Sequence, residues 1–503
     1  MTGAADNHRD PDRSQTGMLV VATLLATFMQ AVNISIPNAA LLHMQGTLSM
    51  SDDQVGWIFS SYLTAGALVM PVAQWLGARF GRKRVLLVSL GVFAVALILV
   101  TRATTPLGFV YARILQGAAS GTLGPLSLAI LLDILPPRRH ARTGMVWTVT
   151  SLAGMLSGPG IGGWLSEYHG WPSIFRVSLP LTAVIMLALA LFLPEKKAAQ
   201  RPTFDFFGLA TFSMGVAGLQ MMLDRGERLE WSASPEIWIE GLAALLGMYL
   251  FVVHIATREK HFLDKALFRD RNFGLSTIIF FAVGFVLLPT LALTSPMLME
   301  IFRYPADTTG FLMIPRGVAL IGALLLAWHA PARLDPRVLF LTGAGLAVYG
   351  TWRMLDYSPQ MHWNVVVLAG VLQGAGLGLT MPGLTRAAFS TLEPSLRPEG
   401  TLLFNLSRLY GSTIGIAIVQ IFFFGNTQSM HLALAQHLHP YGAARSSSGA
   451  ALASLNELVT GQAALIAVIG QFKLLMLALL LVTPLALFLH HPRAAVDTRR
   501  SSP

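Results

Sequence analysis

Three arginines stand inside long apolar stretches of this chain, namely Arg113, Arg316 and Arg408. A guanidinium is always charged and can donate two parallel hydrogen bonds to a carboxylate. An arginine that faces lipid without a partner is costly, so each of the three should face a partner or a water-filled cavity. The arginines therefore favour a central cavity for acidic or neutral amphiphiles. Bonds to backbone carbonyl groups or to polar side chains are the alternative for each.

Two glutamines extend this polar set. Gln116 follows Arg113 by three residues and therefore shares its helix face. Gln373 takes the place of Gln116 when the second half of the chain is laid over the first. We therefore assign five residues to a predicted substrate cavity: Arg113, Gln116, Arg316, Gln373 and Arg408.

Acidic residues are scarce in the same stretches. None of the 25 Asp and Glu residues lies near the middle of an apolar stretch. Asp133, Glu240, Glu300 and Asp356 come closest, each near the end of a stretch. Solvation at the membrane surface explains acids in such places, and a proton carrier is the functional alternative. Asp133 and Glu240 are the candidates for carrying a proton.

The residues needed for other chemistries are missing. The chain has no cysteine, which excludes thiol and disulfide chemistry. His431, His437 and His439 are loosely spaced with no carboxylate nearby, which predicts a solvated loop and not a metal site. No phosphate-binding G-x-x-x-x-G-K-[ST] motif, acid pair or H-E-x-x-H motif occurs. A cofactor, ATP-driven export and a membrane-embedded enzyme are therefore not expected.

The apolar stretches that position these residues are long enough to cross a membrane. Of the 503 residues, 54% are hydrophobic and 12% are charged, whereas a soluble domain has about 25% charged residues. Runs of about 20 apolar residues span the hydrocarbon core as helices. We predict an all-α polytopic membrane protein of about 14 transmembrane helices, at residues 18–40, 54–76, 85–101, 107–135, 144–166, 174–193, 204–223, 238–257, 274–302, 309–328, 338–356, 363–388, 400–424 and 471–490.

The positions of the basic residues predict the orientation of these helices. Lysine and arginine gather in alternate loops, for example at 79–84, 138–142 and 196–201. This is the positive-inside pattern, and it puts the tails 1–17 and 491–503 in the cytoplasm. The net charge of +10 is thereby assigned to topology. Nucleic-acid binding is not expected, because no folded module carries a clustered basic face.

The two halves of the chain repeat. Residues 115–117 and 372–374 both read Leu-Gln-Gly, and several glycines and prolines coincide at the same offset. Parallel repeats are typical of transporters with a site between two bundles. We predict a six-helix bundle over 18–193, an inserted helix pair with flanking loops over 194–273, and a second bundle over 274–490. The second bundle includes a predicted periplasmic loop over 425–470, whose apolar second half should lie along the membrane surface or against a partner.

Glycines recur inside the fifth apolar stretch, which reads GMLSGPGIGG over 154–163. Small residues four apart let helices approach closely, and a proline removes one helical hydrogen bond. A dinucleotide-binding glycine loop would need a preceding strand, whereas this motif lies inside an apolar run. The residues of this motif are Gly154, Gly158, Pro159, Gly162 and Gly163.

A tight basic turn follows the second apolar stretch and contains Gly81, Arg82 and Lys83. Such a turn can latch neighbouring helices on the cytoplasmic side, and plain anchoring at the membrane surface is the alternative. Two further motifs are R-x-x-Q-G at 113–117 and L-D-R-G at 223–226.

Together these motifs resemble the fourteen-helix drug:proton antiporter branch of the major facilitator superfamily, the EmrB-type multidrug efflux transporters. The glycine motif matches that branch's g-x-x-x-G-P-x-x-G-G. The basic turn is similar to the superfamily's G-x-L-a-D-r-x-G-r-k, except that Ala78 replaces the usual acid. Asn33 matches a central asparagine of the first helix and joins the predicted cavity, but Phe28 stands where the family usually has an aspartate.

The resemblance implies a secondary active efflux transporter in the inner membrane. It would exchange small amphiphilic compounds, such as drugs or weak organic acids, for protons by alternating access. Its partners would include membrane lipid, a periplasmic adaptor (HlyD- or EmrA-like) and an outer-membrane channel (TolC-like). An uncoupled facilitator of the same fold is the alternative, and a membrane-embedded enzyme is a more distant one.

Overall fold

A computed structural model describes residues 13–51, 54–195, 204–258, 263–331, 334–437 and 449–490. The predicted tail over 491–503 and most of that over 1–17 lie outside these ranges, as does His439. The helices are α1 (Arg13–Ser35), α2 (Leu41–Leu48), α3 (Trp57–Phe80), α4 (Arg82–Arg102), α5 (Pro106–Ile134), α6 (His140–His169), α7 (Ser173–Arg176), α8 (Ser178–Phe192), α9 (Phe206–Arg225), α10 (Pro235–Thr257), α11 (Ala266–Arg269), α12 (Arg271–Pro296), α13 (Ala306–His329), α14 (Pro336–Arg353), α15 (Trp363–Ser390), α16 (Arg397–Gln436) and α17 (Gly449–Val482).

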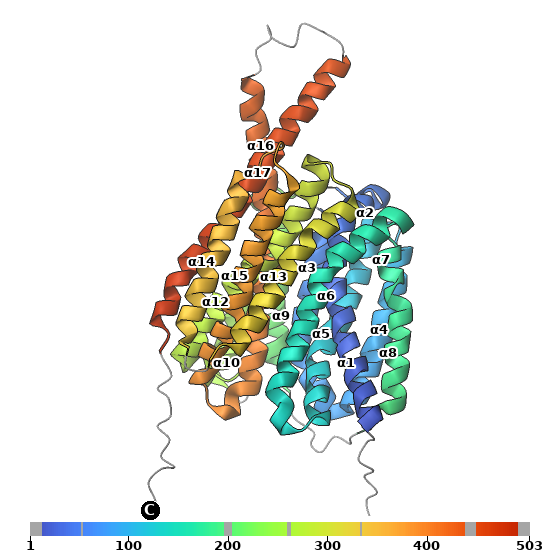
Figure 1. Ribbon diagram of the computed structural model, residues 1–503, viewed down its shortest axis with the longest axis vertical. Helices are drawn as coiled ribbons and strands as arrows, with labels where there is room; N and C mark the ends of the chain where they lie inside the picture. The colour runs from blue at the N-terminus through green and yellow to red at the C-terminus, as the bar shows by residue number, and fades with distance from the viewer. Residues whose placement is uncertain are drawn as a thin grey trace, which may run out of the picture.

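The helices form two bundles and an inserted pair (Figure 1). α1, α3, α4, α5, α6 and α8 pack together as the first bundle, and α12 to α17 form the second. α9 and α10 pack against each other, and α9 also contacts α3 and α16. This arrangement confirms the predicted fold class, an all-α membrane protein of about fourteen spanning helices. The start of α1 and the end of the α17 segment both point away from the α16–α17 hairpin, on opposite sides of the molecule, and this end is called the terminal end (Figure 1).

Twelve helices of the described part are long and apolar enough to cross a membrane. α3 and α6 are not among these twelve because they are less apolar. They are nevertheless long enough to span, with 24 and 30 residues, and they run beside the others. Both helices contact the opposite bundle, α3 through α16 and α6 through α13. Glycine and small polar residues are expected at such helix contacts, which explains the lower hydropathy of these two helices.

The predicted loop over 425–470 is wrong for most of its length, because α16 and α17 extend through it as helices (Figure 1). α16 has 40 residues, about 60 Å at 1.5 Å per residue, which exceeds the ~30 Å hydrocarbon core. The end of α16 and the start of α17 form a helical hairpin that projects beyond the rest of the molecule, and this end is called the hairpin end (Figure 1). His431 Nε2 lies 3.0 Å from Asn456 Oδ1 of the opposite leg. Polar side chains of this kind weakened the apolar pattern without ending either helix.

Two smaller differences concern the first predicted span, 18–40. α1 begins at Arg13, five residues earlier than that span. It ends at Ser35, and a 3₁₀ turn, η1 (Ile36–Ala40), leads into α2. Pro37 lies in η1 and has no backbone N–H to donate, so the regular helical ladder cannot continue through it.

Candidate functional site

The glycines of the 154–163 motif place α6 directly against α1. A β-carbon on Gly154 would lie 2.5 Å from the carbonyl oxygen of Phe28. One on Gly158 would lie 2.1 Å from Ser35 Oγ, and the Ser35 hydroxyl donates a hydrogen bond to the Met155 carbonyl. Real β-carbons do not approach other atoms so closely, so only glycine fits at either position. The motif therefore sets the distance between these two helices.

A second face of the same motif joins the two bundles. A β-carbon on Gly163 would lie 2.2 Å from the carbonyl oxygen of Ala306, the first residue of α13. One on Gly310 of α13 would lie 2.4 Å from the carbonyl oxygen of Pro159. α6 thus packs through glycine against α1 of its own bundle and against α13 of the other.

Polar contacts also close the hairpin end of the bundle interface. The Ser295 hydroxyl of α12 donates to the carbonyl of Asn38 in η1 at 2.8 Å. The Tyr168 hydroxyl of α6 donates to a carboxylate oxygen of Asp307 on α13 at 3.1 Å. Each bond links one bundle to the other, so the bundles are tied together at this end.

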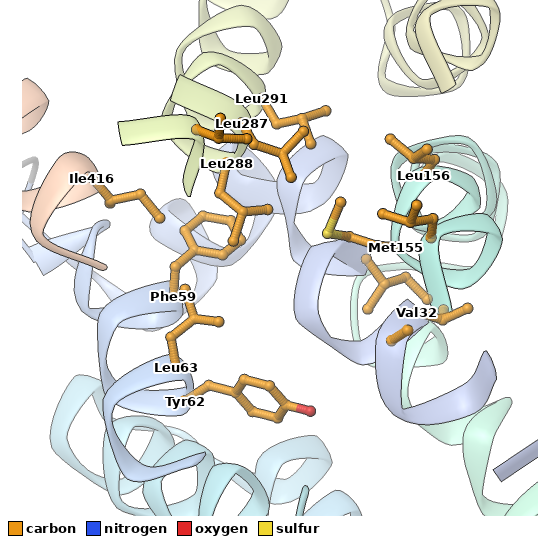
Figure 2. Packing of buried hydrophobic residues seen from close by; sticks show 14 of the residues in the cluster. Val32, Phe59, Tyr62, Leu63, Met155, Leu156, Leu287, Leu288, Leu291 and Ile416 are labelled. Carbon is orange, nitrogen blue, oxygen red and sulfur yellow. The ribbon is translucent and has the colours of Figure 1, made fainter. Parts of the chain in front are cut away.

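Apolar side chains fill the interface between these polar contacts and the middle of the molecule. Figure 2 shows Leu287, Leu288 and Leu291 of α12 facing Phe59 and Leu63 of α3. All five side chains are buried. These buried apolar side chains exclude water from the hairpin side of the interface.

Inside the first bundle, three of the predicted cavity residues meet. Arg113 Nη1 donates to Gln116 Oε1 at 2.6 Å and to the Asn33 carbonyl at 3.3 Å. Gln116 Nε2 donates to Asn33 Oδ1 at 3.0 Å, and Arg113 Nε donates to the Ile58 carbonyl at 3.0 Å. The guanidinium carbon lies 4.3 Å from the centre of the Tyr62 ring, a cation–π distance. All four side chains are almost fully buried, so this cluster is internal to the bundle in this conformation.

The second bundle contains a less satisfied cluster. Arg316 Nη2 donates to the Leu287 carbonyl at 3.1 Å, while its Nε and Nη1 have no partner among the described residues. Gln373 Nε2 donates to Thr351 Oγ1 at 2.8 Å and to Thr290 Oγ1 at 3.3 Å, and its Oε1 has no described partner. Arg316 is 5% exposed and Gln373 is fully buried. Unpaired buried polar groups are costly, which marks this cluster as a place where a further polar group would be stabilised.

Each bundle buries one arginine, but the two arginines are not at equivalent positions of the repeat. Gly117 of α5 lies against the Tyr62 carbonyl of α3, and its repeat partner Gly374 of α15 lies against the Arg316 carbonyl of α13. Tyr62 and Arg316 are therefore equivalent. At the position that repeats Arg113 the second bundle has Gly370, whose missing side chain leaves room for the stem of Arg316.

Tyr357 lies just beyond the end of the α14 segment and is buried near Arg316. Burial raises the pKa of its phenol, although the nearby Arg316 charge acts in the opposite direction. The phenol therefore stays neutral and does not offset the arginine charge.

Arg408 is separate from both clusters. Its backbone lies tightly against α12, because a β-carbon on Gly284 would be 2.0 Å from the Arg408 carbonyl oxygen. The side chain is half-buried, and it makes no hydrogen bond or ion pair with a described residue. The structure thus brings together Asn33, Arg113 and Gln116, places Arg316 near Gln373, and leaves Arg408 alone.

The basic turn latches the terminal end of the first bundle. Gly81 has φ +91°, a conformation that side chains rarely adopt, and it lets α4 follow α3 directly. Arg82 forms an ion pair with Asp133 near the end of α5. Lys83 Nζ donates to the Ala190 carbonyl of α8 at 2.8 Å. The turn therefore connects α4 to α5 and α8, and the proton-coupling candidate Asp133 is part of this latch.

The other proton-coupling candidate lies in the inserted pair. Glu240 Oε1 of α10 accepts a hydrogen bond from Arg225 Nη1 of α9 at 2.5 Å. Arg225 also pairs with Glu236. One arginine is thus shared between two carboxylates that follow each other by one helical turn.

Tyr62 is a residue that the sequence analysis missed. Its hydroxyl donates to Ser120 Oγ of α5 at 2.6 Å, and its ring stacks on Arg113. Tyr62 and Arg113 are on different helices, and no rule of sequence spacing connects residues on α3 and α5. The only signal in the sequence was the glycines of α5, which mark a face where another helix packs closely.

Two membrane-spanning bundles that meet through glycine faces at one end define a membrane transporter. The chain belongs to the Major Facilitator Superfamily, whose sequence profile matches residues 23–416. The predicted superfamily is thereby confirmed, and the protein is a multi-pass membrane transporter and not an enzyme.

Two relatives are named for multidrug export and for fatty acid resistance. The chain is 28% identical to the multidrug export protein EmrB of Haemophilus influenzae over 85% of each chain. It is 29% identical to the fatty acid resistance protein FarB of Neisseria gonorrhoeae over 83% of each chain. A bacterial homologue of the human lysosomal transporter Spinster, solved in an inward-facing conformation, superposes with a TM-score of 0.64 over 97% of this chain and all of that one, at 13% identity.

Proposed function

We propose that this protein exports small amphiphilic compounds, weak organic acids among them, by proton-coupled antiport across the inner membrane. The observation that carries the proposal is the double glycine face of α6, which joins the bundles at the hairpin end through Gly163 and Gly310. Two rigid bundles that touch at one end can rock about that contact and expose a central site alternately to each side.

The charge of the exported compounds is inferred from the buried arginines. Each bundle buries one guanidinium, Arg113 or Arg316, and no carboxylate bonds to either among the described residues. A bundle interior with this charge favours acidic or neutral cargo over lipophilic cations. The names of the relatives, multidrug export and fatty acid resistance, agree with such cargo.

Proton coupling is proposed to involve Asp133 or Glu240. Both acids sit near helix ends and each pairs with an arginine, Asp133 with Arg82 and Glu240 with Arg225. Protonation of either acid would release its arginine and loosen a contact between helices. No cofactor beyond the proton gradient is proposed. An uncoupled facilitator of the same fold is the competing function.

Orientation and partners complete the proposal. The basic turn lies at the terminal end, so the positive-inside pattern assigns that end to the cytoplasm. The α16–α17 hairpin would then enter the periplasm. Its length beyond the bundles makes it the proposed contact for a periplasmic adaptor, which would lead to an outer-membrane channel.

Export from cells that carry the chain tests the proposal. Efflux of an acidic and of a neutral amphiphile is measured by retained compound, with and without an ionophore that collapses the proton gradient. Antiport predicts that the ionophore abolishes efflux against a concentration gradient. Downhill movement that is unaffected by the ionophore, with no uphill efflux, would establish the facilitator instead.

A further inference from the structure

A cleft of about 920 Å³ opens at the terminal end of the first bundle, between α1, α5 and α6. Its walls are mainly aliphatic, and two arginines stand at the start of α6 and in the turn before it. Its main lining residues are Val20, Leu24, Leu131, Arg139, Arg142 and Val146.

The helix contacts indicate which way this cleft faces. α3, α5, α1 and α6 follow one another as neighbours, and the two outer members of this row contact α16 and α13 of the second bundle. α4 and α8 pack on the other side of α5 and α1. The cleft therefore lies on the face of the first bundle that is turned toward the second.

The charged side chains that line the cleft in the described part of the chain are all positive. Arg139 and Arg142 are both exposed, and neither forms an ion pair with a described residue. None of the described residues that line the cleft is acidic. The nearest latch acid, Asp133, is already paired with Arg82. The positive end of the α6 dipole adds to the same field, because α6 begins at His140.

We propose that this cleft is the uptake site for a single-chain amphiphile with a carboxylate head. The carboxylate would be held by Arg139 and Arg142, and the chain would lie along Val20, Leu24 and Val146. The volume is in the range of about 300–1,000 Å³ found for small-molecule sites. Two guanidiniums match a carboxylate, whereas a cationic head would be repelled. The assignment rests on the proposed export function and specifies where its cargo first binds.

Farther along α5 from the cleft residue Leu131, about two helical turns toward the middle of the bundle, is Gly124. It lies between Gln30 and Trp147, since a β-carbon on Gly124 would be 3.5 Å from Gln30 Oε1 and 3.9 Å from the Trp147 ring. The indole N–H of Trp147 has no partner among the described residues. A chain that advances from the arginines would meet these two side chains next.

Equilibrium binding tests the site without any transport step. The purified full chain is placed in nanodiscs of zwitterionic lipid, and laurate and dodecanol are titrated separately. The test variant is Arg139→Gln with Arg142→Gln. The control is Arg138→Gln, which removes an exposed charge from the same turn but not from the cleft. We expect the double variant to weaken laurate binding about tenfold or more, from the loss of two charge-assisted bonds, with dodecanol and the control unchanged.

Three results would overturn the site: unchanged laurate affinity in the double variant, an equal loss in Arg138→Gln, or displacement of laurate by anionic phospholipid added to the nanodiscs. The last would assign the arginines to a lipid headgroup. As a second readout, Val146→Trp should lower the affinity for laurate more than that for hexanoate, because it fills the chain-binding wall. Since no gradient is applied, a negative result here leaves the export test independent.

Discussion

Gly158 of α6 lies so close to Ser35 of α1 that a β-carbon on the glycine would stand 2.1 Å from the serine hydroxyl oxygen. The backbone nitrogen of Ile36 would be 2.8 Å from that β-carbon, so the clash could not be relieved by rotating the serine side chain alone. A side chain at this position must push apart α1 and α6, the helix that also joins the two bundles.

We therefore expect Gly158→Leu to abolish export while the protein still inserts in the membrane. Export of a fluorescent substrate and the amount of protein in the membrane fraction are the measurements. Gly144→Ala, on the same helix with open space around it, is the matched control and should export normally. Wild-type export by a well-expressed Gly158→Leu protein would contradict the assigned role.

Asp133 pairs with Arg82, so substituting each partner in turn should show whether Asp133 carries protons or only holds two helices together. If it carries protons, Asp133→Asn loses the pH dependence of transport while Arg82→Gln retains it. If it only latches α4 to α5, both variants lose similar activity and the double variant is no worse. We expect the first pattern, measured as substrate efflux at several external pH values. Coupling that survives both Asp133→Asn and Glu240→Gln would place the proton route elsewhere.

Arg113 and Arg408 should differ in what their removal does. Arg113→Ala removes two hydrogen bonds to other helices, at the Ile58 and Asn33 carbonyls, each worth about 0.6–2 kcal/mol between membrane helices. It also removes the bond to Gln116 within α5. The melting temperature of the Arg113→Ala protein should therefore be lower than that of the wild type. Its export of acidic and of neutral compounds should fall by similar amounts.

Arg408→Ala should leave the melting temperature close to that of the wild type, because this side chain bonds to no described residue. Export of an acidic compound should fall more than that of a neutral one. Two results together would refute the proposed preference for acidic or neutral cargo. They are robust export of ethidium-like cations by the wild type, and export of acidic compounds that neither arginine substitution changes.

The hairpin is expected to contact an adaptor in native membranes. Leu432 of α16 and Leu458 of α17 are 64% and 65% exposed although both are apolar. Photo-crosslinkers at these positions should capture an adaptor protein, identified by mass spectrometry. A crosslinker at Val88 of α4, which is equally exposed at 65%, is the control and should capture none. Hairpin crosslinkers that never yield an adaptor would count against the contact.

The sequence by itself determined the fold class and the packing motif of this protein. Apolar runs long enough to span lipid must be helices, because lipid offers no partner to an unpaired backbone group. The glycines at 154–163 predicted close helix contacts for a similarly local reason, since four-residue spacing puts them on one face. Neither inference depends on which helix is the neighbour.

Only the tertiary structure decided which side chains are partners. Arg113 stacks on Tyr62 of another helix, and in the second bundle Arg316 occupies the place of that tyrosine while Gly370 stands in for Arg113. Asp133 likewise became a latch residue through Arg82, 51 positions away in the chain. Such partners depend on how non-adjacent helices rotate and approach one another. That geometry is set by packing across the whole bundle, which no local spacing in the sequence records.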